Sequence, residues 1–456
     1  MSGTLSWTTE TIAGWGQYRP ATVKICRPRS GHQVEEALRN PFKPILARGM
    51  GRSYGDAAQC SGGGILEMTA LNRFRAFDAD SGILDCEAGT TLSEILDWFV
   101  PRGWTLPVVP GTRMITVGGA IANDVHGKNH HVDGSFCAHV IDFDLLTPDR
   151  GVVRCSPEQE ASLFQATAGG VGLTGIIFNA RLRLEPIESA WLEVEYEPCP
   201  DLAHALAVLD ATDAGFRYSV GWVDALSGDG RGRTVLTRGN WLPASALPPE
   251  RCAAPLRVPR RPELSIPYRM PEWVLNPTSI RFFNAFNWKR FCSRKRAVID
   301  MDRYFFPLDS VANWNRMYGR RGFVQYQATV PLESAQCLTE LLRRSYQNGF
   351  FSFLGVLKRF GAGGIGMLSH PMPGYTLTLD FPVRDGLERF LRECDRLLLD
   401  WGGRLYLAKD ILALPETIAA MYPRLNEFLK VRAHVDSARV LGSDLSRRLG
   451  WDDRNG

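Results

Sequence analysis

Two lysines stand in sequence contexts that suit proton transfer or anion binding. Lys128 lies in the run H-G-K-N and Lys409 in the run Y-L-A-K-D, so both have small or apolar neighbours rather than a cluster of charges. A lysine that is removed from water has a lowered pKa and can act as a base. Both are therefore candidates for cationic or basic roles, and a solvated surface charge is the alternative for each.

One histidine and two tyrosines add to these candidates. His126 precedes Gly127 and is a candidate for relaying a proton or donating a hydrogen bond, whereas a satisfied core histidine is the alternative. Tyr54 and Tyr406 stand where a ring can pack on a flat ligand, with core packing as the alternative. His130 and His131 follow closely, but no carboxylate–histidine spacing supports a metal site, and we expect none.

A predicted strand over 323–330 carries two glutamines on one side. Gln325 and Gln327 alternate with Tyr326, so both amides face the same way. Buried amides need hydrogen-bonding partners, and a polyol would supply them. We expect Gln325 and Gln327 to bind a substrate, with Trp222 and Tyr318 as apolar walls of the same pocket.

Three glycine-rich segments can bring the backbone close to a ligand. They are A-R-G-M-G-R-S-Y-G-D over 47–56, P-G-T-R-M-I-T-V-G-G-A-I-A-N over 110–123, and A-G-G-V-G-L-T-G-I-I over 168–177. Converging N–H groups make an anion cradle, and small residues let a flat ring or diphosphate lie on the backbone. One such segment alone is more often a plain turn, but three indicate one long ligand, and FAD is a ligand of that kind.

The positions that we expect to bind this ligand come mostly from those segments. They are Ala47, Arg48, Gly49, Met50, Gly51, Arg52, Ser53, Tyr54, Gly55, Gly111, Thr116, Val117, Gly118, Gly119, Ala122, Asn123, His126, Gly172, Ile177 and Tyr406.

The elements that must position these residues form an α+β pattern. Short β-branched runs alternate with helical patterns up to about residue 190, and longer amphipathic helices alternate with strands after it. We predict a ligand-binding domain over 1–190, a substrate domain with an antiparallel sheet over 191–403, and a C-terminal segment over 404–456 that returns to the first domain.

Composition limits the alternatives. The net charge of +4 gives no general affinity for nucleic acid, and ten scattered cysteines without a CxxC pair predict buried, reduced thiols rather than disulfides or zinc. The first residues show no basic segment followed by an apolar core, so we expect no secretory signal, and no apolar run is long enough to span a bilayer. We expect a cytoplasmic protein, with peripheral attachment at the inner membrane; the periplasm is the less favoured location.

The segment 251–296 is basic, aromatic and rich in proline. It holds eleven Arg or Lys residues against two acids, and six prolines interrupt it. This proline density predicts a long loop or lid rather than a continuous helix. The segment fits an anionic lipid headgroup with aromatic side chains entering the interface, and a solvated disordered loop is the alternative.

The glycine motifs together resemble the vanillyl-alcohol oxidase superfamily of FAD-linked oxidases. The order R-G-x-G-R-S-Y-G-D, P-G-T-x-x-x-T-V-G-G-A-I-A and G-x-x-G-L-T-G-I-I carries the resemblance. The segments D-V-H-G-K-N-H-H, F-V-Q-Y-Q, S-F-L-G-V-L-K-R-F-G, D-F-P-V-R-D-G and G-G-R-L-Y-L-A-K-D are similar to a sugar-oxidising branch of it, from about Gly14 to Leu449. The resemblance implies an FAD-binding domain of the PCMH type.

In that branch the expected reaction is oxidation of the ribose 2′-hydroxyl of decaprenylphosphoryl-β-D-ribose to the 2′-keto intermediate, the first half of epimerisation to the arabinose form for cell-envelope synthesis. An NADH-dependent short-chain reductase would be the partner. The resemblance places Lys409 near flavin and substrate, and Lys128 and Lys358 as substrate or phosphate contacts. We expect Lys409, His126 and Tyr54 to be the catalytic residues.

Two departures from the superfamily bear on the cofactor and the pocket. Many members attach FAD through a histidine where this chain has Arg52, which implies non-covalent FAD. Mycobacterial members of the branch carry a cysteine where this chain has Thr378, which we expect to border the substrate. Two other functions remain open, an oxidase of a soluble polyol or aldonolactone and a flavin-binding scaffold without activity.

Overall fold

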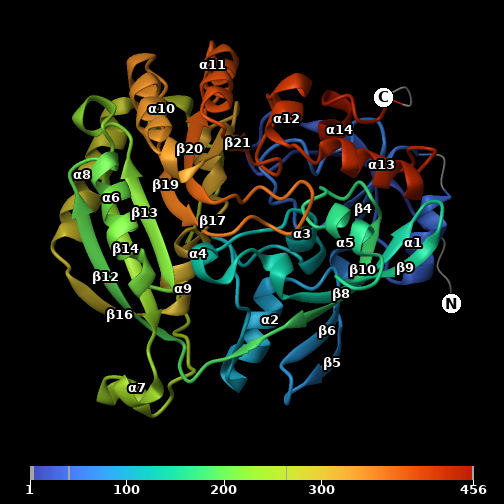
Figure 1. Cartoon of the computed structure of the whole chain (residues 1–456), viewed down its shortest axis with the longest axis horizontal. Helices are drawn as coiled ribbons and strands as arrows, with labels where there is room; N and C mark the ends of the chain where they lie inside the picture. Colours follow the sequence, from blue (N-terminus) through green and yellow to red (C-terminus); the bar gives the residue numbers. More distant parts are fainter. Residues whose placement is uncertain (1–4, 40–41, 263, 454–456) are drawn as a thin grey trace.

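The computed structural model describes residues 5–39, 42–262 and 264–453. Figure 1 shows two lobes side by side. One lobe joins the N-terminal strands to the last helices of the chain, and the other is built on one large antiparallel sheet. The predicted α+β fold class, with an antiparallel sheet in the second half, is confirmed.

The first sheet of the N-terminal lobe ends at the first glycine segment. Its four strands follow the order β1 (Thr8–Ile12), β2 (Ala21–Cys26), β4 (Gly64–Glu67) and β3 (Ile45–Arg48). Strands β2, β4 and β3 run parallel, so their carboxyl ends meet at one edge. Helix α1 (Gly31–Leu38) connects β2 to β3, capped by the Ser30 side chain and with Val34 fully buried.

The second sheet of this lobe supports the other two glycine segments. Its order is β5 (Phe74–Asp78), β6 (Ile83–Glu87), β10 (Ile176–Arg183), β8 (Val140–Thr147) and β9 (Gly151–Cys155), antiparallel throughout. The helices here are α2 (Leu92–Phe99), α3 (Val117–Ala122), α4 (His130–Asp133) and α5 (Ala161–Thr167). A short pair, β7 (Trp104–Thr105) and β11 (Glu185–Pro186), closes this lobe.

The other lobe is an eight-stranded antiparallel sheet. Its order is β16 (Arg296–Asp300), β12 (Trp191–Cys199), β14 (Arg233–Trp241), β13 (Tyr218–Asp224), β19 (Gly355–Phe360), β20 (Gly374–Pro382), β18 (Phe323–Val330) and β21 (Arg404–Leu405). Helices α6 (Leu202–Thr212), α10 (Gln336–Gln347) and α11 (Leu387–Asp400) pack on one face. Their leucines and those of the sheet form one buried cluster.

The opposite face of this sheet carries several of the residues that we expect to bind substrate. Cross-strand pairing sets Gln327 opposite Thr378, Thr378 opposite Val356, and Val356 opposite Trp222. Side chains paired directly across neighbouring strands point to the same face. These four residues therefore form one row across β18, β20, β19 and β13, and we call it the cross-strand row.

The C-terminal segment leaves the large sheet and packs on the N-terminal lobe. After β21 come α12 (Pro415–Met421), α13 (Leu425–Val435) and α14 (Asp444–Arg448). The Ile45 N–H donates to the Val440 carbonyl at 2.8 Å, and Arg448 pairs with Asp56 and Asp410 at 2.8 and 2.9 Å. Figure 1 shows these red helices beside the blue first strands.

The prediction of a long loop over 251–296 is wrong for the second half of that segment. Helix α8 spans Pro277–Cys292, after the short elements α7 (Pro249–Cys252) and β15 (Leu264–Ser265). Pro277 occupies the first helical turn, where no N–H is needed, and Asn276 forms a capping box with Ser279. No further proline occurs before the helix ends. The positions of the prolines therefore decide whether this segment forms a helix, and their number does not. Helix α9 (Met301–Phe305) and β17 (Val311–Ala312) then lead to β18, and β17 pairs with β15.

Three further expectations concern disulfides, membrane-spanning helices and metal sites. All ten cysteines are unpaired, and only Cys252 and Cys292 are exposed. Among the described residues, none of the helices is both long and apolar enough to cross a bilayer. The same residues hold no group of three or more His, Cys, Asp or Glu side chains placed to bind a metal.

Candidate active site

The first glycine segment forms an open turn after β3. Gly51 has a φ of +62°, in the left-handed region that glycine tolerates. The Tyr54 N–H donates to the Ala408 carbonyl at 2.9 Å, which fastens this turn to the C-terminal segment. Within the described residues, the backbone N–H groups of 50–53 find no acceptor. Four free amides on one turn are what an anion cradle requires.

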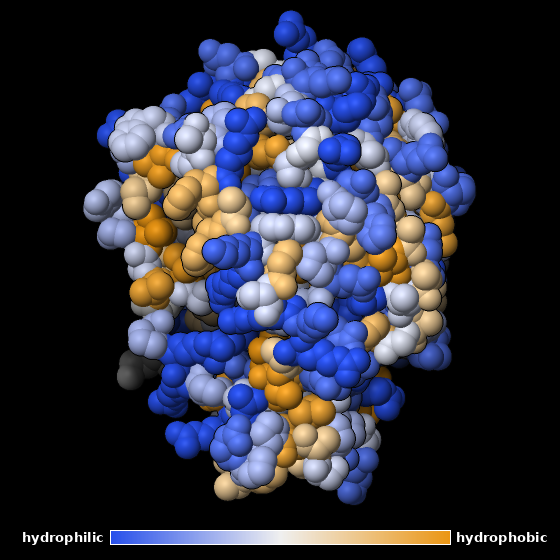
Figure 2. Space-filling model, turned by 90° about the vertical axis from the view of Figure 1, so that its left-hand side faces the viewer, coloured by the Kyte–Doolittle hydropathy of each residue, from blue (hydrophilic) through white to orange (hydrophobic). Residues whose placement is uncertain are grey.

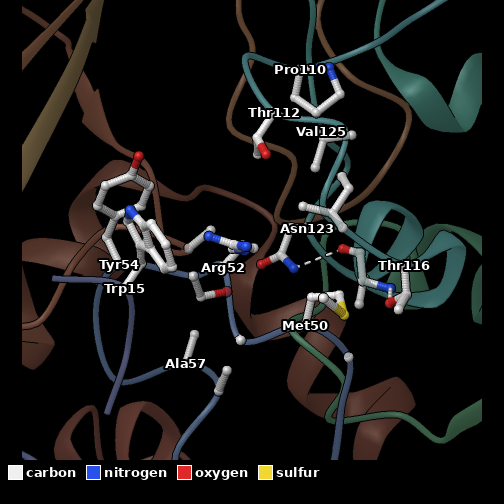
Figure 3. Close-up of a pocket in the computed structure, with 18 of the residues that line it drawn as sticks. Trp15, Met50, Arg52, Tyr54, Ala57, Pro110, Thr112, Thr116, Asn123 and Val125 are labelled. Carbon is white, nitrogen blue, oxygen red and sulfur yellow. Dashed lines mark hydrogen bonds between the residues drawn. The ribbon is translucent and has the colours of Figure 1, made fainter. Parts of the chain in front are cut away.

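The second and third segments lie against the first. Thr116 caps α3 and its hydroxyl accepts from the Gly119 N–H at 3.1 Å, while the Asn123 side chain donates to the Gly119 carbonyl at 2.8 Å (Figure 3). A methyl group on Gly49 would lie 2.2 Å from the Thr116 hydroxyl, so only glycine permits this approach of two loops. The Val171 N–H donates to the Ala122 carbonyl at 2.8 Å and holds the third segment in place.

The three segments enclose a cavity of about 300 Å³. Residues from the large sheet complete its wall, so the cavity lies between the two lobes. The predicted residues that line it are Ala47, Arg48, Gly49, Met50, Gly51, Arg52, Ser53, Tyr54, Gly111, Thr116, Gly118, Gly119, Ala122, Asn123, His126, Gly172, Ile177, Gln325, Lys358, Thr378, Tyr406 and Lys409. A single cavity thus brings together most of the expected residues.

Two lysines face this cavity from separate segments of the chain. Lys358 comes from β19, and Lys409 follows β21, with its ammonium nitrogen 5.2 Å from the Tyr54 ring centre. Burial lowers the pKa of Lys358 to about 8. Burial also lowers the pKa of Lys409, and the charge of Lys358 adds to the effect. Both amines are therefore closer to neutrality near pH 7 than ordinary lysines.

Asp380 is the carboxylate that opposes this shift. It accepts hydrogen bonds from the Gln325 side chain at 2.6 Å and from the Tyr318 hydroxyl at 3.1 Å. Burial raises the pKa of Asp380, while the Gln325 hydrogen bond and the charge of Lys409 oppose that rise. Asp380 therefore fixes Gln325 at the cavity wall and adds negative potential beside Lys409.

His126 is held as a neutral ring. The Gln327 amide donates to its Nε2 at 3.0 Å and to the Thr376 hydroxyl at 3.1 Å. Burial lowers the pKa of His126 well below its ordinary value, with Lys358 as a second cause. Because Nε2 accepts, the proton lies on Nδ1, which has no partner among the described residues. His126 thus offers one N–H at the cavity wall.

Tyr406 joins this group from the C-terminal segment. Its hydroxyl donates to the Asn123 carbonyl at 2.8 Å, and its ring lies 5.1 Å from that of His126. Burial raises the pKa of Tyr54, so that side chain stays a phenol and can donate a hydrogen bond but not act as a base near neutral pH.

Six predicted residues lie outside the cavity lining: Gly55, Val117, Lys128, Trp222, Tyr318 and Gln327. The Lys128 ammonium donates to the Tyr304 carbonyl, and burial lowers its pKa to about 7. To reach a ligand in the cavity, this group would have to leave that carbonyl. Trp222 is the outer end of the cross-strand row, and Tyr318 and Gln327 act on the wall through Asp380 and His126.

Sequence reasoning missed several wall residues. Trp15 lies beneath the Arg52 guanidinium at 3.9 Å, and Figure 3 shows Arg52 extending between Trp15 and Asn123. Asp309 and Trp314 reach the cavity from the segment before β18. None of them stands in a motif, and only the N-terminal glycines beside Trp15 gave a signal, since Gly14 and Gly16 pack on the Tyr54 and Gly55 carbonyls.

The residues of the cavity fit FAD. The free amides of 50–53 suit a diphosphate, and the small residues of α3 let a flat ring lie on the backbone. The Arg52 Nε and the Asn123 Oδ1 are buried without a partner in the described structure, as polar atoms prepared for a ligand would be.

Comparison with known proteins agrees with this geometry. The model of an FAD binding domain matches residues 24–156, and the model of D-arabinono-1,4-lactone oxidase matches residues 377–449. The chain is 37% identical over 449 residues to the decaprenylphosphoryl-β-D-ribose oxidase of Mycolicibacterium smegmatis. This alignment covers 97% of this chain and 98% of that protein.

Two further relatives cover less of the chain. An uncharacterised protein in the mprA 5′ region of Streptomyces coelicolor is 36% identical over 369 residues, covering 79% of this chain and 100% of that protein. Cytokinin dehydrogenase 9 of Oryza sativa subsp. japonica is 29% identical over 218 residues, 44% of this chain and 41% of that protein. The chain belongs to the decaprenylphosphoryl-β-D-ribose oxidase family of FAD-linked oxidases.

Proposed function

We propose that this protein is an FAD-dependent oxidoreductase that oxidises the ribose 2′-hydroxyl of decaprenylphosphoryl-β-D-ribose to the 2′-keto intermediate. The observation that carries the proposal is one cavity that joins a cradle of free amides to two lysines with lowered pKa values. Near-full-length similarity to the mycobacterial oxidase supports the choice of substrate.

Lys409 takes the hydroxyl proton in this proposal. Oxidation of a secondary alcohol removes a hydride and a proton, and bound FAD supplies the hydride acceptor. The lowered pKa leaves a fraction of Lys409 as the free amine, which can accept the hydroxyl proton. Asp380, across the cavity wall, stabilises the ammonium that results.

Other residues bind and orient the sugar. The His126 Nδ1–H has no protein acceptor among the described residues and can donate to a sugar oxygen. Gln325 is fixed by Asp380, and Lys358 offers a charge to the phosphate. Thr378 lies between them and has no thiol, so reagents that trap a cysteine at this position find no nucleophile here.

FAD is held without a covalent bond in this proposal. Arg52 occupies the turn where a linking histidine would stand, and its guanidinium stacks on Trp15 at 3.9 Å. A guanidinium is not a nucleophile toward the flavin ring, because it stays protonated. Arg52 instead contributes positive charge beside the cradle.

The reaction is the first half of an epimerisation to decaprenylphosphoryl-arabinose for cell-envelope polysaccharide. We propose an NADH-dependent short-chain reductase as the partner that reduces the keto intermediate, and a quinone or oxygen as the acceptor that reoxidises the flavin. Because the substrate carries a prenyl chain, we also propose a peripheral position at the inner membrane, on its cytoplasmic side.

A second candidate function is oxidation of a soluble aldonolactone or polyol. The observation that favours it is the match of residues 377–449 to D-arabinono-1,4-lactone oxidase. Those residues supply Thr378, Asp380 and Lys409, which either substrate would use.

Anaerobic mixing with each substrate class separates the candidates. Purified protein containing FAD is mixed with a short-chain polyprenylphosphoryl ribose and, separately, with arabinono-1,4-lactone, and the loss of flavin absorbance is followed. We expect bleaching with the prenyl sugar alone. Bleaching with the lactone alone would replace the first candidate by the second, and bleaching with neither would contradict both.

A further inference from the structure

Helix α8 exposes aromatic side chains that a protein in water would normally bury. Phe282 is 80% exposed and Phe286 62% exposed, and Trp273, just before the helix, is 75% exposed. Within the described chain none of these three rings contacts another aromatic ring. Single exposed apolar residues need no explanation, but neighbouring large rings indicate an interaction surface.

The exposed rings lie on one face of the helix, together with cations. Phe282 and Phe286 are four residues apart, and Lys289 and Arg290 follow one turn later, so all four share a face. We call these four residues the docking face. The opposite face is anchored, since Ile280 is buried and the Asn284 amide donates to Asp224 at 2.6 Å. The docking face is therefore presented by a fixed helix.

The charges around the docking face have one sign. Lys289, Arg290, Arg294 and Lys295 are exposed, and none of them pairs with an acid among the described residues. Glu272 is the one acidic residue that the structure describes between 251 and 296. Figure 2 looks onto this side of the molecule, where apolar side chains interrupt the polar surface. Unpaired cations beside exposed aromatic rings complement an anionic lipid surface.

The helix also stands next to the cavity. On its inner side Phe291 lies 6.0 Å from Trp222, the outer end of the cross-strand row that leads through Val356 to the cavity. Phe283 lies 5.2 Å from Phe353, whose neighbour Leu354 lines the cavity. An apolar chain leaving the cavity along the row thus meets α8 first.

We propose that the docking face of α8 binds the surface of an anionic bilayer and so sets the cavity beside the membrane. In this position the prenyl chain stays in lipid while its sugar phosphate enters the cavity over Val356 and Trp222. The purpose of the contact rests on the proposed lipid-linked substrate, whereas the contact itself depends only on the rings and charges of the helix.

Vesicle sedimentation tests the proposal on the full-length holoprotein. We expect binding to vesicles of phosphatidylcholine with phosphatidylglycerol and little binding to phosphatidylcholine alone. Replacing Phe282→Ser and Phe286→Ser together removes two rings and should weaken binding about a hundredfold, at about tenfold for each ring. Lys289→Glu with Arg290→Glu should abolish the preference for the anionic vesicles.

Val152→Ser is the matched control, because Val152 is an exposed apolar residue on β9 and should not alter vesicle binding. All docking-face variants should oxidise a water-soluble short-chain substrate at the wild-type rate, which shows that they fold. Wild-type protein that ignores both vesicle types would overturn the proposal. So would variants that bind vesicles normally, or that lose only a complex with the reductase. Binding that follows the expected pattern in a protein inactive on every ribose substrate would support docking and refute the proposed reaction.

Discussion

Replacing Lys409 with methionine removes the proposed base while keeping a side chain of similar length. The Lys409 ammonium borders the cavity, 5.2 Å from the Tyr54 ring centre, and burial and Lys358 lower its pKa. A positioned general base contributes about 10²- to 10⁴-fold to a rate. We therefore expect Lys409→Met to slow flavin reduction by about 10³-fold, with FAD still bound.

The lowered pKa of Lys409 also predicts how the rate of flavin reduction depends on pH. Only the free amine accepts a proton, so the wild-type reduction rate should fall as the pH drops through the lowered pKa of Lys409. The midpoint should lie well below about 10.4, the pKa of an ordinary lysine. In Lys409→Met this slope should disappear, because the titrating group is gone.

Anaerobic stopped-flow absorbance with saturating short-chain substrate measures the single-turnover rate directly. Lys24→Met is the control, because Lys24 is a half-buried residue of β2 whose ammonium donates to Thr9 outside the cavity; this variant should keep the wild-type rate and pH profile. A Lys409→Met rate within about tenfold of wild type, or an unchanged pH slope, would refute the assignment of the base.

Three further predictions concern the wall and its support. Lys358→Met should raise KM by about tenfold or more, because a charge-assisted hydrogen bond to phosphate is lost. Since the charge of Lys358 also helps to lower the pKa of Lys409, kcat is compared at a pH high enough to keep Lys409 deprotonated, where it should change little; steady-state kinetics would contradict this if only kcat fell. Gly55→Ala would place a methyl group 1.8 Å from the Asp410 carbonyl and should lower FAD content, measured by absorbance, whereas Gly215→Ala meets no atom within 4 Å and should not. Burial raises the pKa of Asp395 to about 7, so the contribution of its protonated carboxyl to stability is full below about pH 4 and is lost as the pH rises through 7. Asp395→Asn should therefore raise Tm at pH 8 but not at pH 4. Equal shifts in Tm at both pH values would argue against a raised pKa of Asp395.

The glycine segments were predictable because their signal is local. Short runs of glycine with Thr116 as a cap define turns whatever surrounds them, and the structure gathers them at one cavity. The two glutamines of β18 were also predicted on one face, but they differ in role. Gln325 lines the cavity, whereas Gln327 lies outside the lining and donates a hydrogen bond to His126.

Other features depend on tertiary contacts that no motif records. Asp380 matters because Gln325, Tyr318 and Lys409 converge on it from separate segments. Lys128 sits in a promising run, yet its ammonium turns to the Tyr304 carbonyl. Helix α8 was hidden by prolines that lie before it or at its first position, where proline is tolerated; the positions of the prolines along 251–296 predict the helix better than their number does.

The absorbance spectrum of the purified protein before and after acid precipitation tests the central claim, that free amides of the first glycine turn hold FAD in this cavity beside Lys409. We predict a yellow protein whose colour moves to the supernatant on precipitation, as expected for non-covalent flavin held beside Arg52. A colourless protein that takes up no added FAD would contradict the account of the cavity, and colour retained in the pellet would contradict the non-covalent binding.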